Sequence, residues 1–172
     1  GLIAEVDYGA ARARVRIGTV ITDWIPWLVN RAGGDRDWVA PEAGEQVTIL
    51  CPSGHLETGI IIGSIYRTAH PANGASADLR RVTFADGTVC EYDRASHTFT
   101  LNVSDSDAKV KVLSGSKVEI VAADEIKLAA ASIKIEGPVT QTGGDMTSDG
   151  ISAQTHTHGG ILPGGANTTG PN

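Results

Sequence analysis

The chain has 172 residues, enough for one ordinary domain or two small ones, and a single β domain below about 100 residues buries its core only marginally. Hydrophobic residues make up 41% of the sequence but aromatic residues only 5%, so the apolar side chains are mainly Val, Ile, Leu and Ala, which favours β-strands. The net charge of -6 and the absence of any Lys/Arg block argue against nucleic acid as a partner. The longest apolar run, residues 59–65, is far short of the roughly 20 residues that cross a bilayer, so we expect neither a membrane anchor nor a secretion signal here.

Residues 1–70 predict a small barrel of short strands. Residues 12–17 alternate Arg with Ala, Val and Ile, and this period of two indicates a strand with one face in water. The strands expected from such patterns are residues 2–7, 12–17, 20–26, 46–50 and 59–66.

The stretch of residues 29–45 is rich in turn-forming residues and is predicted to be a long loop that folds back over the barrel. Trp24, Trp27 and Trp38 would then cluster. A plug on the core is the interpretation we favour, and a partner-binding or stacking surface is the alternative.

Residues 71–80 are small and polar without periodicity, which is typical of a linker, and a second domain is expected to begin near Arg81. Asp86-Gly87 lies between two β-prone runs and predicts a hairpin, followed by a strand over residues 88–93. Cys51 and Cys90 lie in separate strand-like segments, and we expect two buried free thiols.

From residue 110 the sequence repeats pairs of aliphatic residues at positions i and i+2, with Lys or Glu between them. The pairs start at intervals of 8, 8 and 7 residues and are Val110/Val112, Val118/Ile120, Ile126/Leu128 and Ile133/Ile135. Such a pattern predicts a short-period β solenoid whose aliphatic face is inside and whose charged face is outside. About eight residues per coil cannot enclose a core in one chain, so residues 81–140 predict an obligate trimer in which three chains form a three-sided prism.

Residues 141–172 contain almost no apolar side chains, and composition alone favours a disordered tail. In an extended segment, however, His156 and His158 would point the same way, about 6 to 7 Å apart. On a threefold axis three such pairs supply six imidazoles, enough for an octahedral nitrogen cage around one metal ion. The pair is weak as an isolated motif, and its position after a trimeric prism is what favours a metal site.

The sequence carries no Gly-x-Ser-x-Gly elbow, Cys-x-x-Cys pair, phosphate-binding loop or His-Glu-x-x-His motif. Glu91 and Asp93 would project in parallel from one strand face rather than facing each other across a substrate. His55, His70 and His97 occur singly and are assigned no chemistry. We therefore expect neither enzymatic activity nor a small-molecule substrate.

Several segments together resemble a known family. They are Val15-Arg16-Ile17-Gly18, Trp24-Ile25-Pro26-Trp27, Arg31-Ala32-Gly33-Gly34, Trp38, Gly44-Glu45-Gln46-Val47, Gly59-Ile60-Ile61-Ile62-Gly63 and Thr155-His156-Thr157-His158-Gly159-Gly160. With the aliphatic repeats, they resemble phage baseplate assembly protein V, the membrane-piercing spike of P2-like contractile tails and R-type pyocins.

The resemblance implies an all-β protein with an N-terminal OB-fold barrel that attaches to the baseplate hub protein, followed by an intertwined trimeric β-helix with a metal-bound apex. It also implies one iron ion per trimer, held by His156 and His158 of all three chains. Physical reasoning alone does not choose iron, since nitrogen sites generally bind Ni²⁺, Cu²⁺ and Zn²⁺ more tightly than Fe²⁺.

The implied function is mechanical. The protein would be made in the bacterial cytoplasm, be carried at the tail tip of a virion or pyocin particle, and puncture the outer membrane of a target bacterium. Larger spikes of this type carry a lysozyme domain or an effector, for which we expect no room here. The alternatives are a receptor- or glycan-binding β-helical tail fibre, and a single-strand nucleic-acid binder that uses the tryptophans for stacking and that the acidic charge disfavours.

Overall fold

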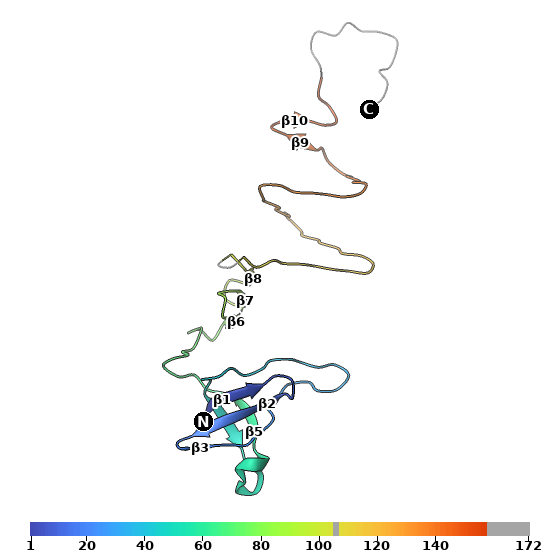
Figure 1. Ribbon diagram of the computed structural model, residues 1–172. Coiled ribbons are helices and arrows are strands. Elements are labelled where there is room, and N and C mark those ends of the chain that lie inside the picture. The colour runs from blue at the N-terminus through green and yellow to red at the C-terminus, as the bar shows by residue number, and fades with distance from the viewer. Residues whose placement is uncertain (105–106, 158–172) are drawn as a thin grey trace. The chain divides into compact units, whose positions relative to one another are not determined.

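The computed structural model describes residues 1–104 and 107–157. Contacts divide the chain into two compact units, Gly1–Leu113 and Ser114–Asn172. Apart from two short 3₁₀ helices, η1 and η2, the regular structure of the described residues is β (Figure 1). None of the described helices is long and apolar enough to cross a membrane. The elements are β1 Leu2–Asp7, β2 Arg12–Ile17, β3 Val20–Ile21, β4 Val47–Leu50, η1 Pro52–Gly54, η2 Leu56–Thr58, β5 Ile60–Ser64, β6 Leu79–Thr83, β7 Val89–Asp93, β8 Thr98–Asn102, β9 Thr147–Ser148 and β10 Ile151–Ser152.

Strands β1, β2 and β3 form an antiparallel sheet, with a bulge in β1 between Ile3 and Glu5. β1 and β2 have the predicted bounds, but β3 ends at Ile21 rather than continuing to residue 26. At Thr22 the backbone N–H still donates to the Val15 carbonyl, but the Val15 N–H donates to the Thr22 hydroxyl rather than to its carbonyl, each at 2.9 Å, which interrupts the regular ladder. Pairing resumes at Ile25, which exchanges two backbone hydrogen bonds with Ala13, each 2.9 Å long.

The first sheet and the β4–β5 pair are joined into a closed ring by backbone contacts. On one side Leu2 of β1 bridges Gln46, and the Ile3 N–H donates to the Glu45 carbonyl at 2.9 Å. On the other side Trp27 bridges Ile61 of β5 in parallel. The ring therefore passes through β1, β2, the segment around residues 25–28, β5 and β4, which is a small barrel.

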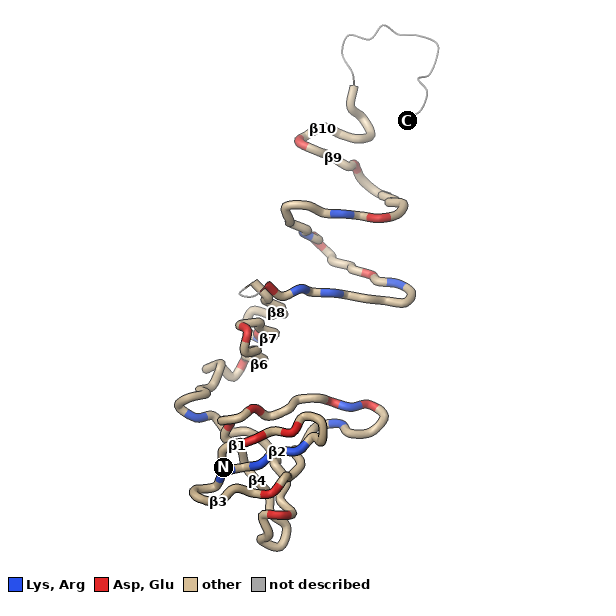
Figure 2. Tube along the Cα trace, viewed as in Figure 1, with Lys and Arg blue, Asp and Glu red and all other residues tan. Residues whose placement is uncertain are grey.

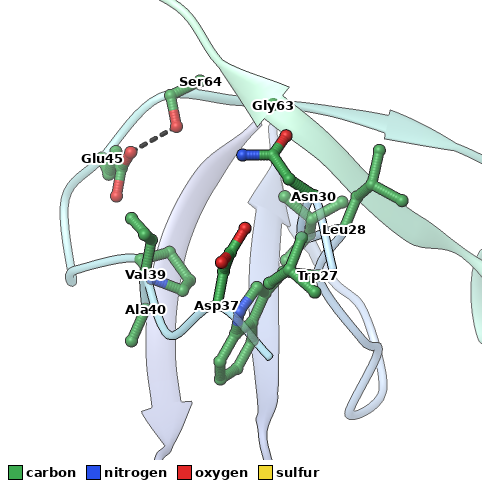
Figure 3. A pocket seen from close by; sticks show the side chains of 12 residues that line it. Trp27, Leu28, Asn30, Asp37, Val39, Ala40, Glu45, Gly63 and Ser64 are labelled. Atoms are coloured by element: carbon green, nitrogen blue, oxygen red, sulfur yellow. Dashed lines mark hydrogen bonds between the residues drawn. The ribbon is translucent and has the colours of Figure 1, made fainter. Parts of the chain in front are cut away.

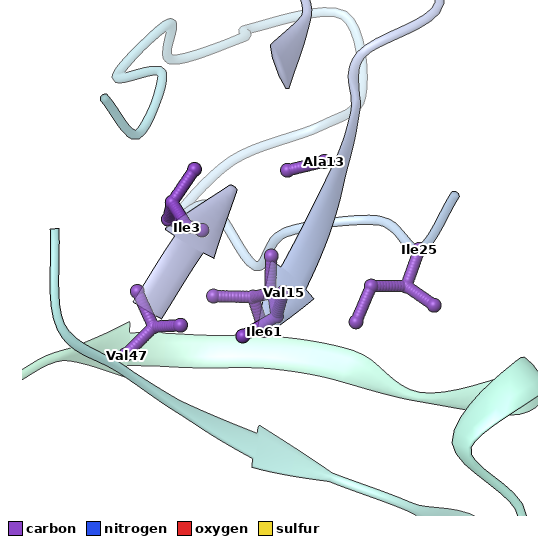
Figure 4. Close-up of a cluster of buried hydrophobic side chains, with 6 residues drawn as sticks. All are labelled: Ile3, Ala13, Val15, Ile25, Val47 and Ile61. Atoms are coloured by element: carbon purple, nitrogen blue, oxygen red, sulfur yellow. The ribbon is translucent and has the colours of Figure 1, made fainter. Parts of the chain in front are cut away.

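The core of the barrel is a compact group of aliphatic side chains, each no more than 3% exposed, drawn from every segment of the ring (Figure 4). Its members are Ile3, Ala13, Val15, Ile25, Val47 and Ile61. Fully burying a Val or Ile side chain contributes about 1.5–3 kcal/mol, so this group is a main source of the barrel's stability.

A second antiparallel sheet has the order β6-β7-β8. Its first turn confirms the hairpin predicted at Asp86-Gly87: Gly87 has φ +89°, and the Thr88 N–H donates to the Asp86 carboxylate at 2.9 Å. β6 begins at Leu79, two residues before the expected start at Arg81.

The two faces of this sheet differ in chemistry. On one face Arg81 forms an ion pair with Glu91 of the neighbouring strand. On the other face Val82, Cys90 and Leu101 lie directly opposite one another across the three strands. Cys51 and Cys90 are free thiols, as predicted, but both are half-buried rather than buried.

Between residues 107 and 146, among the residues described, no strand is formed, and the single chain does not form the predicted β-helix or prism. Bends do occur after each aliphatic pair, at residues 115–116, 123–124, 131 and 137. The paired residues are 51–74% exposed. Lys, Asp and Glu are spread along this segment, as Figure 2 shows. They include two ion pairs, Lys117 with Glu119 and Lys134 with Glu136. One copy of the chain thus supplies the repeat and its turns but no core.

Candidate functional site

The predicted metal-binding segment follows a short hairpin formed by β9 and β10, in which Thr147 pairs with Ser152 and Ser148 with Ile151. The two turn residues, Asp149 and Gly150, have φ +49° and +79°. A two-residue hairpin turn of this kind requires positive φ at both positions, and Asp-Gly is a preferred dipeptide for it. The sequence therefore fixes the hairpin locally, just before the histidines.

His156 lies four residues after Ser152 and is exposed. Its Nδ1 is 2.8 Å from the Ser152 carbonyl oxygen. A carbonyl oxygen only accepts, so Nδ1 carries the hydrogen and the lone pair of the neutral imidazole is on Nε2. Metal-ligating histidines almost always donate the other ring N–H in this way, so His156 fits a metal ligand.

His158, the second predicted ligand, lies outside the described residues. Within residues 1–104 and 107–157 of one chain, no three His, Cys, Asp or Glu side chains come close enough together to hold a metal ion. One described chain thus contributes His156 as a candidate ligand, and further ligands would come from His158 and from other copies.

The two carboxylates of β7, Glu91 and Asp93, have structural partners. Glu91 is held by Arg81, and the Asp93 side chain accepts the Ala95 N–H at 2.8 Å. This bond lowers the pKa of Asp93 below its ordinary value, which favours its carboxylate form in the turn that follows β7.

The barrel carries a pocket of about 240 Å³ between β5 and the loop that follows Trp27 (Figure 3). Apolar walls and two acidic side chains line it, and Figure 3 shows Glu45 bonded to Ser64 above the pocket. Its lining residues are Trp27, Leu28, Val29, Asn30, Asp37, Val39, Ala40, Pro41, Glu45, Ile61, Gly63 and Ser64.

The three tryptophans do not form the expected plug. Trp27 packs against the core and meets Trp38 edge to face, with ring centroids 5.6 Å apart. Trp38 is 62% exposed, and Trp24 stands apart with the Arg14 guanidinium 5.8 Å from its ring. The prediction was wrong for Trp24 and Trp38, because Trp27 of the ring segment packs against the core while Trp24 and Trp38 are 41% and 62% exposed.

Comparisons with known proteins bear on both ends of the chain. Residues 1–66 match the Type VI secretion system/phage-baseplate injector OB domain, and these residues contain the whole barrel ring. Residues 150–172 match the GpV Apex motif. The spike protein of Escherichia phage P2 is 34% identical over 181 residues, which cover 93% of this chain and 86% of that protein.

The chain belongs to the phage baseplate spike family. The expected resemblance and the expected OB-type barrel are therefore confirmed, as is the all-β class. As a member of a family of structural tail proteins, this spike is a virion tail component, and its family suggests a structural rather than an enzymatic role.

The sequence predicts His156 and His158 as ligands but does not indicate Ser152, whose hydroxyl accepts the Thr155 N–H and whose carbonyl accepts the His156 ring N–H. Asp149-Gly150 is the signal that could have located this turn, since it has the hairpin dipeptide that was used at Asp86-Gly87.

Proposed function

We propose that this spike-family protein is the central membrane-piercing spike of a contractile tail, of a phage or of an R-type pyocin. In this role sheath contraction drives it point-first into the outer membrane of a target bacterium. The observation that carries the proposal is the similarity to a phage spike protein over 93% of the chain, from the barrel to the apex motif.

The spike works as a homotrimer. The aliphatic pairs of residues 110–135 are half or more exposed in one chain, although their spacing is regular and a charged residue stands between the members of each pair. Three copies in parallel would bury these pairs along one axis and leave the charged residues in water. The trimeric β-helix would extend over residues 81–140, after a linker at residues 71–80.

The barrel, within residues 1–70, attaches the spike to the baseplate hub protein. Its core is formed by its own side chains, which leaves its outer surface for a partner. Its surface includes the exposed Trp38 and the pocket with Asp37 and Glu45. The acidic charge of the whole chain supports a protein partner rather than nucleic acid.

The apex, within residues 141–172, holds one iron ion through His156 and His158 of the three chains, six imidazole nitrogens in octahedral geometry. Bound iron would cross-link three glycine-rich ends that have little apolar surface to hold them together. The Nδ1–H of His156 is already committed to the Ser152 carbonyl, which supports ligation through Nε2.

The test combines molar mass by light scattering with elemental analysis on one untagged sample. We expect the mass of three chains with about one iron per trimer, from the six nitrogen ligands that an octahedral site requires. The double substitution His156→Ala/His158→Ala is expected to lose the metal and keep the trimer. A monomer would overturn the trimeric spike, and a metal-free trimer would overturn the apex.

Membrane piercing is tested separately on assembled particles. Particles that carry His156→Ala/His158→Ala should adsorb to target cells but release less periplasmic content than unmodified particles. If these particles lack the metal but release as much periplasmic content as unmodified particles, the metal-bound apex is not needed for piercing. Retention of the isolated spike on target glycans would favour the fibre alternative.

A further inference from the structure

Ser152 makes more hydrogen bonds than any neighbouring residue in the hairpin that precedes His156. Its hydroxyl oxygen accepts the backbone N–H of Thr155 at 2.7 Å and that of Gln154 at 3.1 Å. The hydroxyls of Ser152 and Thr155 lie 2.8 Å apart and share a further hydrogen bond. Its carbonyl oxygen takes the His156 Nδ1–H at 2.8 Å. One residue thus closes the turn and orients the imidazole.

The turn is also tied to the chain before the hairpin. The Gln154 side-chain amide donates to the Gly144 carbonyl at 2.9 Å, and the Gln141 side-chain amide donates to the same oxygen at 2.9 Å. The Met146 carbonyl accepts the Ala153 N–H at 2.8 Å. The segment from Gln141 to His156 is therefore held together by polar bonds and does not depend on an apolar core.

We infer that Ser152 is the positioning residue of the apex: it holds His156 in the Nδ1–H tautomer, with Nε2 presented to the metal. This inference rests on the proposed metal site and assigns to it a residue outside the His-x-His motif. The reason is preorganisation. An exposed histidine on a free chain would have to lose tautomer and rotamer freedom when it binds metal, and three copies would lose it together.

The two functions of Ser152 are separable by substitution. Ser152→Ala removes the hydroxyl that holds the Thr155 and Gln154 N–H groups but leaves the carbonyl in place. Ser152→Thr keeps a hydroxyl on a strand residue and should restore the turn. Ser148→Ala is the matched control, because Ser148 is in the paired strand and makes no side-chain hydrogen bond within the described part of the chain.

The experiment loads full-length protein, stripped with a chelator, with Co²⁺ alone. Affinity is measured by competition with a chromophoric chelator, coordination geometry by the visible d–d spectrum, and assembly by light scattering. Loss of a group that directly orients a metal ligand typically weakens metal binding about 10–100-fold. Ser152→Ala keeps the carbonyl that bonds His156 and loses only the hydroxyl that fixes the turn, so we expect the lower end, about 10-fold, with a changed d–d spectrum. Ser152→Thr should recover both, and Ser148→Ala should change neither.

The reference variant is His156→Ala. If it binds Co²⁺ as tightly as the unmodified protein, the proposed metal site is wrong. If it loses Co²⁺ while Ser152→Ala keeps the full affinity and the original spectrum, the metal site stands and the role of Ser152 is overturned.

A second variant keeps the inference testable if Ser152→Ala does not form the trimer. Thr155→Val removes the hydroxyl bond to Ser152 and keeps the backbone N–H, so we expect a trimer with a smaller loss of Co²⁺ affinity than for Ser152→Ala. Unchanged affinity and spectrum in this variant would also overturn the inference.

Discussion

The barrel and the repeat segment use the same aliphatic residue types with opposite results. In the barrel, Ile3, Val15, Ile25, Val47 and Ile61 are all at most 3% exposed. In residues 110–139, every Val, Ile and Leu is between 51% and 90% exposed. Composition therefore does not decide whether a segment buries its own core. Chain geometry decides it, because the barrel closes a ring of backbone contacts and the repeats do not.

The contrast has a simple physical origin. Strands of four to six residues connected by loops can fold back on one another and shield one face each. A repeat of about eight residues gives one short extended stretch and a bend, which leaves both sides of the aliphatic pair in water. The barrel is expected to be stable by its own contacts, and the repeats only through copies of themselves.

The largest effect is expected when a charged residue replaces one member of an aliphatic pair, which tests whether the repeats are buried only between copies of the chain. Ile126→Asp would bring three carboxylates to the trimer axis, at a cost of several kcal/mol for each unpaired buried charge. We expect loss of the trimer, measured by light scattering. Lys127→Asp is the matched control, since Lys127 stands between Ile126 and Leu128 and should face outward. Equal effects of the two substitutions would contradict an aliphatic axis.

The second largest effect is expected from a substitution in the barrel core, which lowers the free energy of unfolding. Ile25→Ala removes a fully buried side chain and should lower the free energy of unfolding of the barrel by about 2–5 kcal/mol. All three tryptophans lie in residues 24–38, so tryptophan fluorescence during denaturant unfolding reports on this region alone.

The control is Ile62→Ala on β5, where the side chain is 42% exposed, and we expect a change within about 0.5 kcal/mol. The trimer mass of both variants should equal that of the unmodified protein. Loss of the trimer in Ile25→Ala would show that the repeats depend on the barrel, contrary to the comparison.

The smallest expected effect concerns the β6–β7 turn. The Thr88 N–H lowers the pKa of Asp86 below its ordinary value of 3.8. A carboxyl with a lowered folded pKa stabilises the fold fully above its unfolded pKa and loses this contribution as pH falls through the folded value. Stability should therefore decline below pH 3.8.

Asp86→Asn keeps an oxygen that can accept the Thr88 N–H but removes the titrating group. Thermal unfolding followed by circular dichroism, above and below pH 3.8, should show a smaller pH dependence for the variant than for the unmodified protein. The same pH dependence in both proteins would assign the acid sensitivity to other carboxylates, of which Asp93 is one with a lowered pKa.

The local features of the fold could be predicted from the sequence. Alternation predicted the bounds of β2, the β-prone run of residues 2–7 those of β1, and Asp86-Gly87 the hairpin, because each depends on neighbouring residues only. The end of β3 could not be predicted, since it depends on the Thr22 hydroxyl bonding to Val15, and neither could the outward position of Trp38. Such contacts are decided by tertiary packing.

The candidate site was predictable in part for the same reason. The spacing of His156 and His158 predicts them as ligands, and this stays a prediction. The hydrogen bonds of Ser152 could not be predicted, because they depend on the conformation of a four-residue turn. The prism stays a prediction, because its contacts would be between chains. Aliphatic pairs such as Val110/Val112 indicate that the segment needs burial but not which surfaces of other copies would bury it.

The two free cysteines give each sheet system its own chemical reporter. Cys51 follows β4 of the barrel, and Cys90 lies on one face of the β6-β7-β8 sheet, opposite Val82 and Leu101. Both thiols are half-buried, so a small alkylating reagent would modify them at measurable rates. Assembly that covers this face of the sheet would slow alkylation of Cys90, while the alkylation rate of Cys51 would serve as an internal reference. Mass spectrometry could then follow assembly through the native cysteines, without an added label site.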